Sequence, residues 1–419
     1  MKKQYLGLDI LRGFGVFMVV WLHSAFYYFD GLYDLDLNNP PLIVTLIGLL
    51  LMFAGLFAMI SGTAHTLQLH RKADSGYGPK KILVFNSIGG LLILAIGYAY
   101  FIFTGAGLVH FETRSMNNSM LVDLIRYGRI STVLSERVLY VDSLTMIGMN
   151  ILIMGLIFVL ANRWVRNKKL RSWSSFYLLS AFGIFVFSLV RIPLYDVYLK
   201  AVAGKQLGMV LLLNGLVNKN NPLLPYLAFG LMGAWLASML KERGWRVLLR
   251  TALPLSLALL TIGVVLYVGL PDTMLQRSID LKWYAIMTAQ LGLFLGMMLA
   301  ALRYYDFRRE EDTRHRSFVS TFIYRFGVAG LTVFFVESVV SACIYRVLSF
   351  LIPGLHFGLL ASLAYGLVLA LCWGFFLMLW ERAQFRYGLE HFYCSILDHF
   401  GESEKKNKLN RFINSGDRP

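Results

Sequence analysis

Three side chains near the start of the chain could do chemistry in apolar surroundings. Asp9, Arg12 and His23 fall within a run of mostly apolar residues. Arg12 and His23 are eleven residues apart, which on a helix is three turns plus about 20° and roughly 16 Å along the axis. They therefore share one helix face, with Asp9 beside Arg12 one turn earlier. Ionisable groups in a lipid-spanning helix are costly and by default mark a functional site.

The composition predicts a membrane protein that could position such groups between helices. The 419 residues are 57% hydrophobic and only 15% charged, and a soluble protein of this length carries more charge. Apolar runs of about twenty residues recur, which is enough to cross ~30 Å of hydrocarbon. We predict an all-α, polytopic membrane protein of about ten transmembrane helices, at residues 7–29, 43–69, 82–104, 142–162, 174–198, 222–240, 249–270, 283–302, 322–350 and 357–380.

The net charge of +16 is explained by topology rather than by nucleic acid. With ten spans, about three times as many lysines and arginines fall in the loops on one side as in those on the other. This asymmetry places both termini in the cytoplasm and makes the lipid bilayer the main partner. We expect a multi-pass protein of a prokaryotic plasma (inner) membrane. The three cysteines, at 343, 372 and 394, have no metal-like spacing, so we expect neither a disulfide framework nor a metal site.

The chain divides into a helical membrane domain, residues 1–381, and a cytoplasmic tail, residues 382–419. In the tail, apolar residues at helical spacing over 385–400 predict an amphipathic surface helix. The polar end, 402–419, is expected to be disordered. The longest outer segment, 105–141, is expected to be functional or partly helical. Since no large soluble domain is present, any activity must lie between the helices or at their ends.

The first span resembles the opening helix of the transmembrane acyltransferase superfamily. The residues that carry the resemblance are Leu8-Asp9-x-Leu11-Arg12-Gly13, followed after a valine-rich run by His23-Ser24. The superfamily includes acyltransferase family three, the heparan-alpha-glucosaminide N-acetyltransferases and the YeiB-like proteins. Weaker similarities follow in the same order at Asp142–Gly148, Asn221–Tyr226 and Arg386–Glu390. The last of these lacks the family's proline, and the Arg-x-x-Arg of family-three members has no counterpart here.

The resemblance implies acyl transfer at the membrane. An acyl-coenzyme A, often acetyl-coenzyme A, supplies the group from the cytoplasmic side, and the acceptor is a hydroxyl or amine of a glycan, glycolipid or other lipid-linked polymer. His23 is then the general base, because histidine changes charge nearest neutral pH; a transient acyl-imidazole is a variant. Arg12 either binds the donor phosphates or pairs with Asp9, and the two roles are compatible. A histidine that only bonds a backbone carbonyl is the structural alternative.

Other residues are candidates for binding the two substrates. Those that could meet the donor are Ser61, Thr63, His65, Arg71 and Lys72, although close helix packing and lipid headgroup contact are the simpler explanations. Those that could meet the acceptor are Asp30, Asp34, Arg191 and Glu337. Arg191 and Glu337 each need a partner inside the membrane, and we expect them to serve one another or the acceptor. Asn86 and Asn150 are expected to bond across helices.

Two rival functions fit the same sequence. A membrane transporter or lipid flippase would use the intramembrane arginine, glutamate and histidine as substrate or proton-relay groups; no internal repeat of the kind common in transporters is detectable. A non-catalytic scaffold of an envelope complex would tolerate substitution of His23. A homodimer is compatible with each of the three functions.

Overall fold

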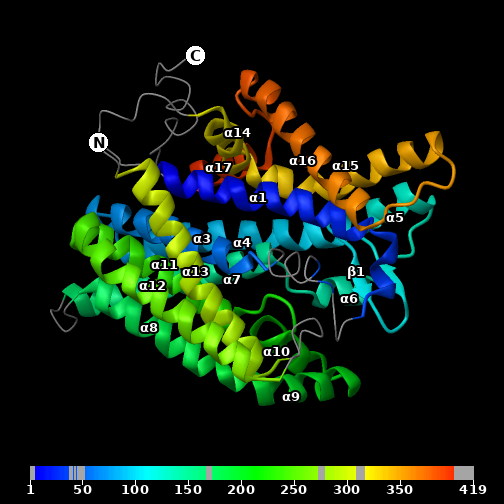
Figure 1. Ribbon diagram of the computed structural model, residues 1–419. Helices are drawn as coiled ribbons and strands as arrows, with labels where there is room; N and C mark the ends of the chain where they lie inside the picture. The colour runs from blue at the N-terminus through cyan, green and yellow to red at the C-terminus, as the bar shows by residue number, and fades with distance from the viewer. Residues whose placement is uncertain are drawn as a thin grey trace.

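The computed structural model describes residues 5–36, 41, 44, 52–166, 172–271, 279–307 and 317–400. Over these ranges the chain is almost entirely helical (Figure 1). A two-stranded antiparallel sheet, with Val109 opposite Met116, is formed by β1 (Leu108–His110) and β2 (Ser115–Asn117). The helices are α1 (Leu6–Tyr27), η1 (Asp30–Asp34), α3 (Ala54–Asp74), α4 (Pro79–Ala99), η2 (Tyr100–Thr104), α5 (Met120–Tyr127), α6 (Leu134–Leu139), α7 (Ser143–Arg166), α8 (Trp173–Phe187), η3 (Ser188–Val190), α9 (Arg191–Ala203), α10 (Leu207–Val217), α11 (Leu223–Glu242), α12 (Gly244–Gly269), α13 (Leu281–Tyr305), α14 (Phe318–Val328), α15 (Gly330–Leu351), α16 (Leu359–Arg382) and α17 (Leu389–Phe400).

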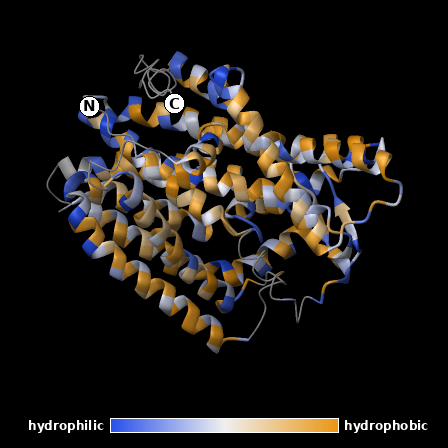
Figure 2. Ribbon diagram, turned by 45° about the horizontal axis from the view of Figure 1, so that its top comes forward, coloured by the Kyte–Doolittle hydropathy of each residue, from blue (hydrophilic) through white to orange (hydrophobic). Residues whose placement is uncertain are grey.

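The architecture confirms an all-α, multi-pass membrane protein. In the described ranges, nine helical segments are long and apolar enough to cross a bilayer. Of the predicted span 43–69, the structure describes residue 44 and residues 52–69, and α3 begins at Ala54. Hydrophobic residues cover the outward faces of the long helices (Figure 2), and large apolar side chains such as Leu179, Leu212 and Val268 are exposed there. Such a surface is suited to lipid rather than to water.

Helix α11 is one centre of the bundle. Every residue from Leu223 to Leu240 is buried, and α11 packs against α3, α7, α8 and α12. At the crossing with α3, Gly62 faces the carbonyl of Gly230, and Gly233 faces the carbonyl of Met59. Small residues allow two backbones to approach this closely, which is how membrane helices gain packing energy without a hydrophobic driving force between them.

Helix α1 is the second centre, and it carries the residues of the predicted site. It packs against α13, α14, α15 and α16. Gly13 faces the carbonyl of Ile323 on α14, while the carbonyl of Trp21 faces Gly366 on α16. These two close approaches lie on either side of the helix centre. They fix both the depth and the rotation of α1, and therefore the direction in which His23 points.

The predicted ninth span is not one helix but two. Helix α14 ends and α15 begins on either side of Ala329. The Arg12 side chain donates its Nε–H to the carbonyl oxygen of Gly327 at 2.9 Å. The carboxylate of Glu390, on α17, accepts the backbone N–H of Leu331 at 2.6 Å. Side chains from the first and last described helices therefore cap the loose backbone groups that the break creates.

The segment 105–141 forms one end of the bundle, which we call the hairpin end. It contains β1, β2, α5 and α6, so the prediction of a partly helical segment is confirmed. Helix α17 lies near the opposite end, where α1 begins (Figure 1). It contacts α4 and α15 and buries none of its residues completely, as expected for a surface helix. The predicted disordered end, 402–419, lies outside the described residues.

We predict that Gly62→Ala destabilises the protein. A Cβ at residue 62 would overlap the carbonyl oxygen of Gly230, so α3 and α11 must move apart, at a cost of about 1–3 kcal/mol. The measurement is the thermal unfolding midpoint of the purified protein in detergent. The matched control is Gly183→Ala, because a Cβ at residue 183 meets nothing within 4 Å. An unchanged midpoint for Gly62→Ala, beside an unchanged control, would contradict the packing described for α3 and α11.

Candidate functional site

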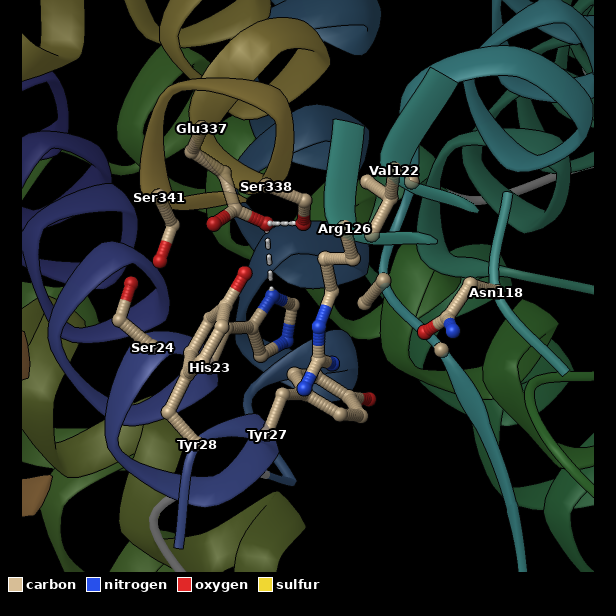
Figure 3. Close-up of a pocket in the computed structure, with 13 residues that line it drawn as sticks. His23, Ser24, Tyr27, Tyr28, Asn118, Val122, Arg126, Glu337, Ser338 and Ser341 are labelled. Carbon is tan, nitrogen blue, oxygen red and sulfur yellow. Dashed lines mark hydrogen bonds and ion pairs between the residues drawn. The ribbon is translucent and has the colours of Figure 1, made fainter. Parts of the chain in front are cut away.

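His23 and Glu337 form a buried histidine–carboxylate pair between α1 and α15. The Nδ1 atom of His23 lies 3.0 Å from Oε1 of Glu337 (Figure 3). The glutamate side chain is 1% exposed and the histidine side chain 19% exposed. Ser338 also donates its hydroxyl to Oε1, at 2.6 Å. With an ionised carboxylate, which only accepts hydrogen bonds, and a neutral imidazole, Nδ1 is the donor in this pair and Nε2 keeps a lone pair for another proton.

This pair lies at the wall of a large cavity at the hairpin end. The cavity has a volume of about 820 Å³ and is lined by α1, η2, the β1 strand, α6, α9 and the ends of several further helices. His23 is one of its lining residues. A smaller pocket of about 20 Å³ adjoins it and shares His23, Tyr27, Ala106 and Gly107 with it. The cavity is of the size that takes small molecules, and it brings them to the free edge of the His23 ring.

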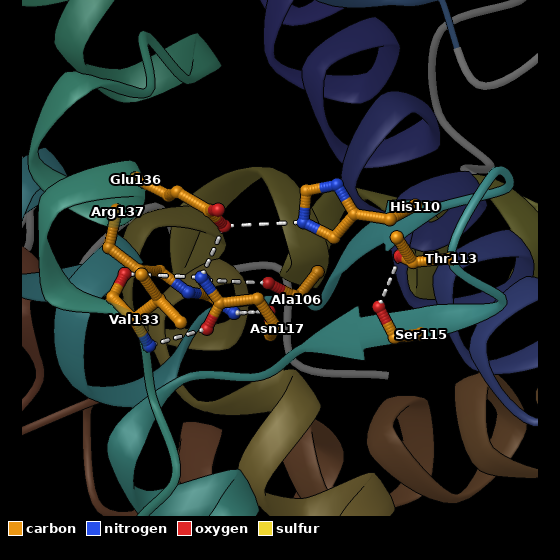
Figure 4. A network of polar contacts seen from close by, with 8 residues as sticks. All are labelled: Ala106, His110, Thr113, Ser115, Asn117, Val133, Glu136 and Arg137. Atoms are coloured by element: carbon orange, nitrogen blue, oxygen red, sulfur yellow. Dashed lines mark hydrogen bonds and ion pairs between the residues drawn. The ribbon is translucent and has the colours of Figure 1, made fainter.

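A second histidine–glutamate pair lines the same cavity. Nε2 of His110 lies 3.2 Å from Oε2 of Glu136, which also accepts the Asn117 amide at 2.8 Å (Figure 4). Here the two side chains are 41% and 43% exposed. Water screens an exposed pair, whereas the buried Glu337 acts on His23 at low dielectric. The His23 pair is therefore the stronger candidate for proton transfer.

Arg137 fixes the backbone of the segment that carries the second pair. It is completely buried and donates to the backbone carbonyls of Phe101, Ala106 and Asn117 at 2.8, 2.8 and 2.6 Å. These three contacts join η2, the loop after it and β2 through one side chain, and Figure 4 shows those with Ala106 and Asn117. Charge-assisted hydrogen bonds of this kind are strong. They position the residues of segment 105–141 that line the cavity.

The structure places Asp9 and Arg12 away from the cavity. Arg12 Nη2 lies 2.9 Å from Oδ1 of Asp9, and its Nε–H is bonded to Gly327 as described above. Of the two roles that the sequence left open for Arg12, the geometry matches the pairing role. Arg12 lies about three turns of α1 from His23, and Asp9 about four. They fix the helix that carries the histidine rather than contact the cavity.

The five candidate donor residues all lie on α3, and the structure brings two of them together. His65 and Lys72 line a small pocket with Asn86 and Tyr393. Lys72 is buried, with Nζ 3.1 Å from the centre of a phenylalanine ring on α4, and burial raises the pKa of Tyr393 on α17. Thr63 instead packs against α11 and donates to the carbonyl of Gly233 at 3.0 Å, which fits the packing alternative. Ser61 and Arg71 lie on the same helix and are only partly buried.

The acidic candidates for acceptor binding are used in closing the hairpin end. Asp30 accepts the backbone N–H of Phe357 at 2.5 Å and lies 3.4 Å from Nδ1 of His356. Asp34 forms an ion pair with Arg114 on the β1–β2 turn. Both carboxylates therefore join loops to one another, and neither lines the cavity.

The prediction that Arg191 and Glu337 serve one another is wrong. Arg191 is completely buried and donates to the backbone carbonyls of Val217 and Lys219, each at 3.1 Å. Its guanidinium lies 4.5 Å from the ring centre of Trp283. It thus organises the chain before α11, while Glu337 pairs with His23. By contrast, the amides of Asn86 and Asn150 do bond across helices, to the carbonyls of Ile151 at 2.6 Å and Tyr226 at 3.2 Å.

The sequence analysis missed the pairing of His23 with Glu337, although a signal for it exists. In the predicted topology the first and ninth spans run in the same direction, and each residue lies about 15 residues into its span. The two therefore share a depth in the membrane. Arg191 lies at a similar depth in the fifth span, so depth alone could not choose between the two partners for Glu337. The role of Arg137 was also missed, because it depends on the folded shape of segment 105–141.

Comparison with known proteins adds no identification. The chain matches no protein-family model and no curated protein. The site is therefore interpreted from its own geometry.

We predict that Arg137→Met loosens segment 105–141. The substitution leaves three buried carbonyls without their donor, and each such group costs about 1–3 kcal/mol. We expect the segment to be cut by an added protease at least tenfold faster than in the wild type, in detergent and under native conditions. The control is Arg129→Met, since Arg129 is exposed in the same segment. Equal cleavage of the Arg137 and Arg129 variants would show that the carbonyl contacts do not hold the segment in place.

Proposed function

We propose that the chain is an integral-membrane acyltransferase. It would move an acyl group, acetyl in the simplest case, from acyl-coenzyme A to a hydroxyl or amine of a glycan, glycolipid or other envelope acceptor. The observation that carries the proposal is the buried His23–Glu337 pair at the wall of an 820 Å³ cavity. The resemblance of the first helix to the transmembrane acyltransferase superfamily, which includes His23 itself, supports it.

The proposed reaction uses the free edge of the His23 ring. Nε2 takes the proton of the acceptor hydroxyl or amine as its oxygen or nitrogen attacks the thioester carbonyl. The tetrahedral intermediate collapses, the carbon–sulfur bond breaks, and the proton on Nε2 passes to the leaving thiolate. The Glu337 carboxylate holds the ring through Nδ1 and stabilises the positive charge that develops on it, as a carboxylate does in a catalytic triad.

The two substrates would reach His23 from opposite ends. We place the acceptor in the cavity at the hairpin end. We place the donor phosphates at the α17 end, with His65 and Lys72 as candidate contacts because they share one pocket there. The predicted charge asymmetry of the loops would put that end in the cytoplasm, where coenzyme A thioesters are made, in the plasma membrane of a prokaryote.

A transporter is the second candidate, and the break between α14 and α15 is the observation that favours it. Discontinuous helices form substrate sites in many transporters through their free backbone groups. In this chain, however, the side chains of Arg12 and Glu390 already form hydrogen bonds with the free backbone groups at the break. The break is therefore a weaker basis for a substrate site than the cavity beside His23.

The prediction is that both members of the buried pair are needed for transfer. We expect His23→Ala to lower kcat by roughly 10²–10⁴-fold, because it removes the base. Glu337→Gln should lower kcat by up to roughly 10⁴-fold, because the neutral amide lacks the charge and favours the wrong tautomer of the ring. The measurement is transfer of labelled acetyl from acetyl-coenzyme A to a panel of glycan and lipid acceptors, by purified protein in lipid.

Two matched variants serve as controls. Glu112→Gln removes an exposed carboxylate of the same loop region and should leave kcat unchanged. His110→Ala tests the exposed pair in the same cavity, and a loss of transfer only in this variant would move the base to His110. All variants must give the wild-type size-exclusion profile. If His23→Ala binds acetyl-coenzyme A and transfers the acetyl group fully, His23 takes no part in the chemistry. If no variant binds the donor, the transporter is favoured.

A further inference from the structure

Arg126 points into the small pocket beside His23. It lies on α5, which packs against α15, the helix that carries Glu337. The pocket is lined by Arg126 together with His23, Asn118 and Glu337 (Figure 3). Figure 3 shows the Arg126 guanidinium beside the ring of His23, on the side away from the carboxylate. A cation therefore stands next to the edge of the imidazole to which the proposed function assigns proton transfer.

Aromatic rings hold this guanidinium without neutralising it. Its carbon lies 4.9, 5.3 and 5.5 Å from the ring centres of Tyr28, Tyr127 and Tyr345. Ring faces attract a guanidinium and fix its plane, but they leave its N–H groups for planar acceptors. Within the described ranges, no carboxylate lies within ion-pair distance of Arg126. The side chain is thus preorganised for a ligand rather than paired.

The neighbouring charges are already in use. The carboxylate of Asp34 pairs with Arg114, and Arg137 is bonded to backbone carbonyls. Oε1 of Glu337 accepts from both His23 and Ser338. The acidic acceptor candidates Asp30, Asp34 and Glu337 each have a partner within the protein, although Oε2 of Glu337 is buried without one. The charge in the small pocket that has no carboxylate partner among the described residues is that of Arg126.

We propose that Arg126 binds an anionic group of the acceptor, a carboxylate or a phosphate, and so selects acidic acceptors for transfer. The identification of this ligand as the acceptor rests on the proposed function. A guanidinium binds such groups through two parallel hydrogen bonds. The small pocket, of about 20 Å³, has room for about one water-sized group, such as one oxygen of the anion. The sugar or lipid body would occupy the adjoining cavity, with its hydroxyl or amine at His23.

The test is direct binding, which does not require transfer. Three probes share one sugar body: methyl glucuronide carries a carboxylate, glucose 1-phosphate a phosphate, and methyl glucoside no charge. Their dissociation constants are measured by calorimetry on the full chain in lipid nanodiscs. We expect one or both anionic probes to bind the wild type at least tenfold more tightly than methyl glucoside. The probe that binds more tightly identifies the anionic group as a carboxylate or a phosphate.

The variants separate a ligand contact from a structural role. Arg126→Ala should abolish the preference for the anionic probes, and Arg126→Lys should restore part of it. Arg129→Ala removes an exposed arginine three residues further along and should keep the full preference. The proposal is overturned if the wild type binds all three probes with equal affinity. It is also overturned if Arg126→Ala loses as much affinity for the neutral probe as for the anionic ones.

A further arm separates this proposal from the proposed function. His23→Ala should retain the preference for anionic probes, because the anion contacts Arg126 and not the base. If the preference is present but no acetyl transfer occurs, the anion site stands and the acyltransferase proposal fails. If transfer occurs and Arg126→Ala lowers kcat equally for neutral and acidic acceptors, Arg126 stabilises the reaction intermediate instead, and the acceptor-binding role is overturned.

Discussion

Backbone groups left unpaired where one helix ends and the next begins need partners, and much of this structure depends on one such break. At Ala329 the chain lies between α14 and α15, with Gly327 and Gly330 close by, and glycine weakens a helix. The Arg12 side chain donates to the unpaired carbonyl of Gly327. The Glu390 carboxylate accepts from the unpaired N–H groups of Leu331 and Thr332. The direction of α15, and with it the position of Glu337 two turns later, follows from this arrangement.

The same logic applies to α1, the helix that carries His23. Close backbone approaches at Gly13 and Trp21 fix it against α14 and α16, and the Asp9–Arg12 pair ties its first turns to the break. A histidine near its last turn is then held by position as well as by the hydrogen bond to Glu337. Rigid support of this kind matters for proton transfer, because small displacements of a catalytic group are costly.

Much of the fold could be predicted from the sequence, because apolar runs of membrane length leave few alternatives to helices. The break at Ala329 could not, since the apolar run continues through it and only distant residues make it tolerable. In the site, His23 was identified from its type and surroundings. Its partner was not, because Glu337 and Arg191 lie at comparable depths and only the three-dimensional packing shows that Arg191 is occupied by backbone carbonyls.

The capping of the break by Glu390 has a consequence for how the protein is made. Membrane helices enter the bilayer in the order of synthesis, so α1, α14 and α15 are in place before α17 leaves the ribosome. Until then the N–H groups of Leu331 and Thr332 lack the carboxylate that binds them in the finished protein. The capping of α15, the helix that carries Glu337, is therefore completed last. A nascent chain would not assemble the His23 site before α17 has docked.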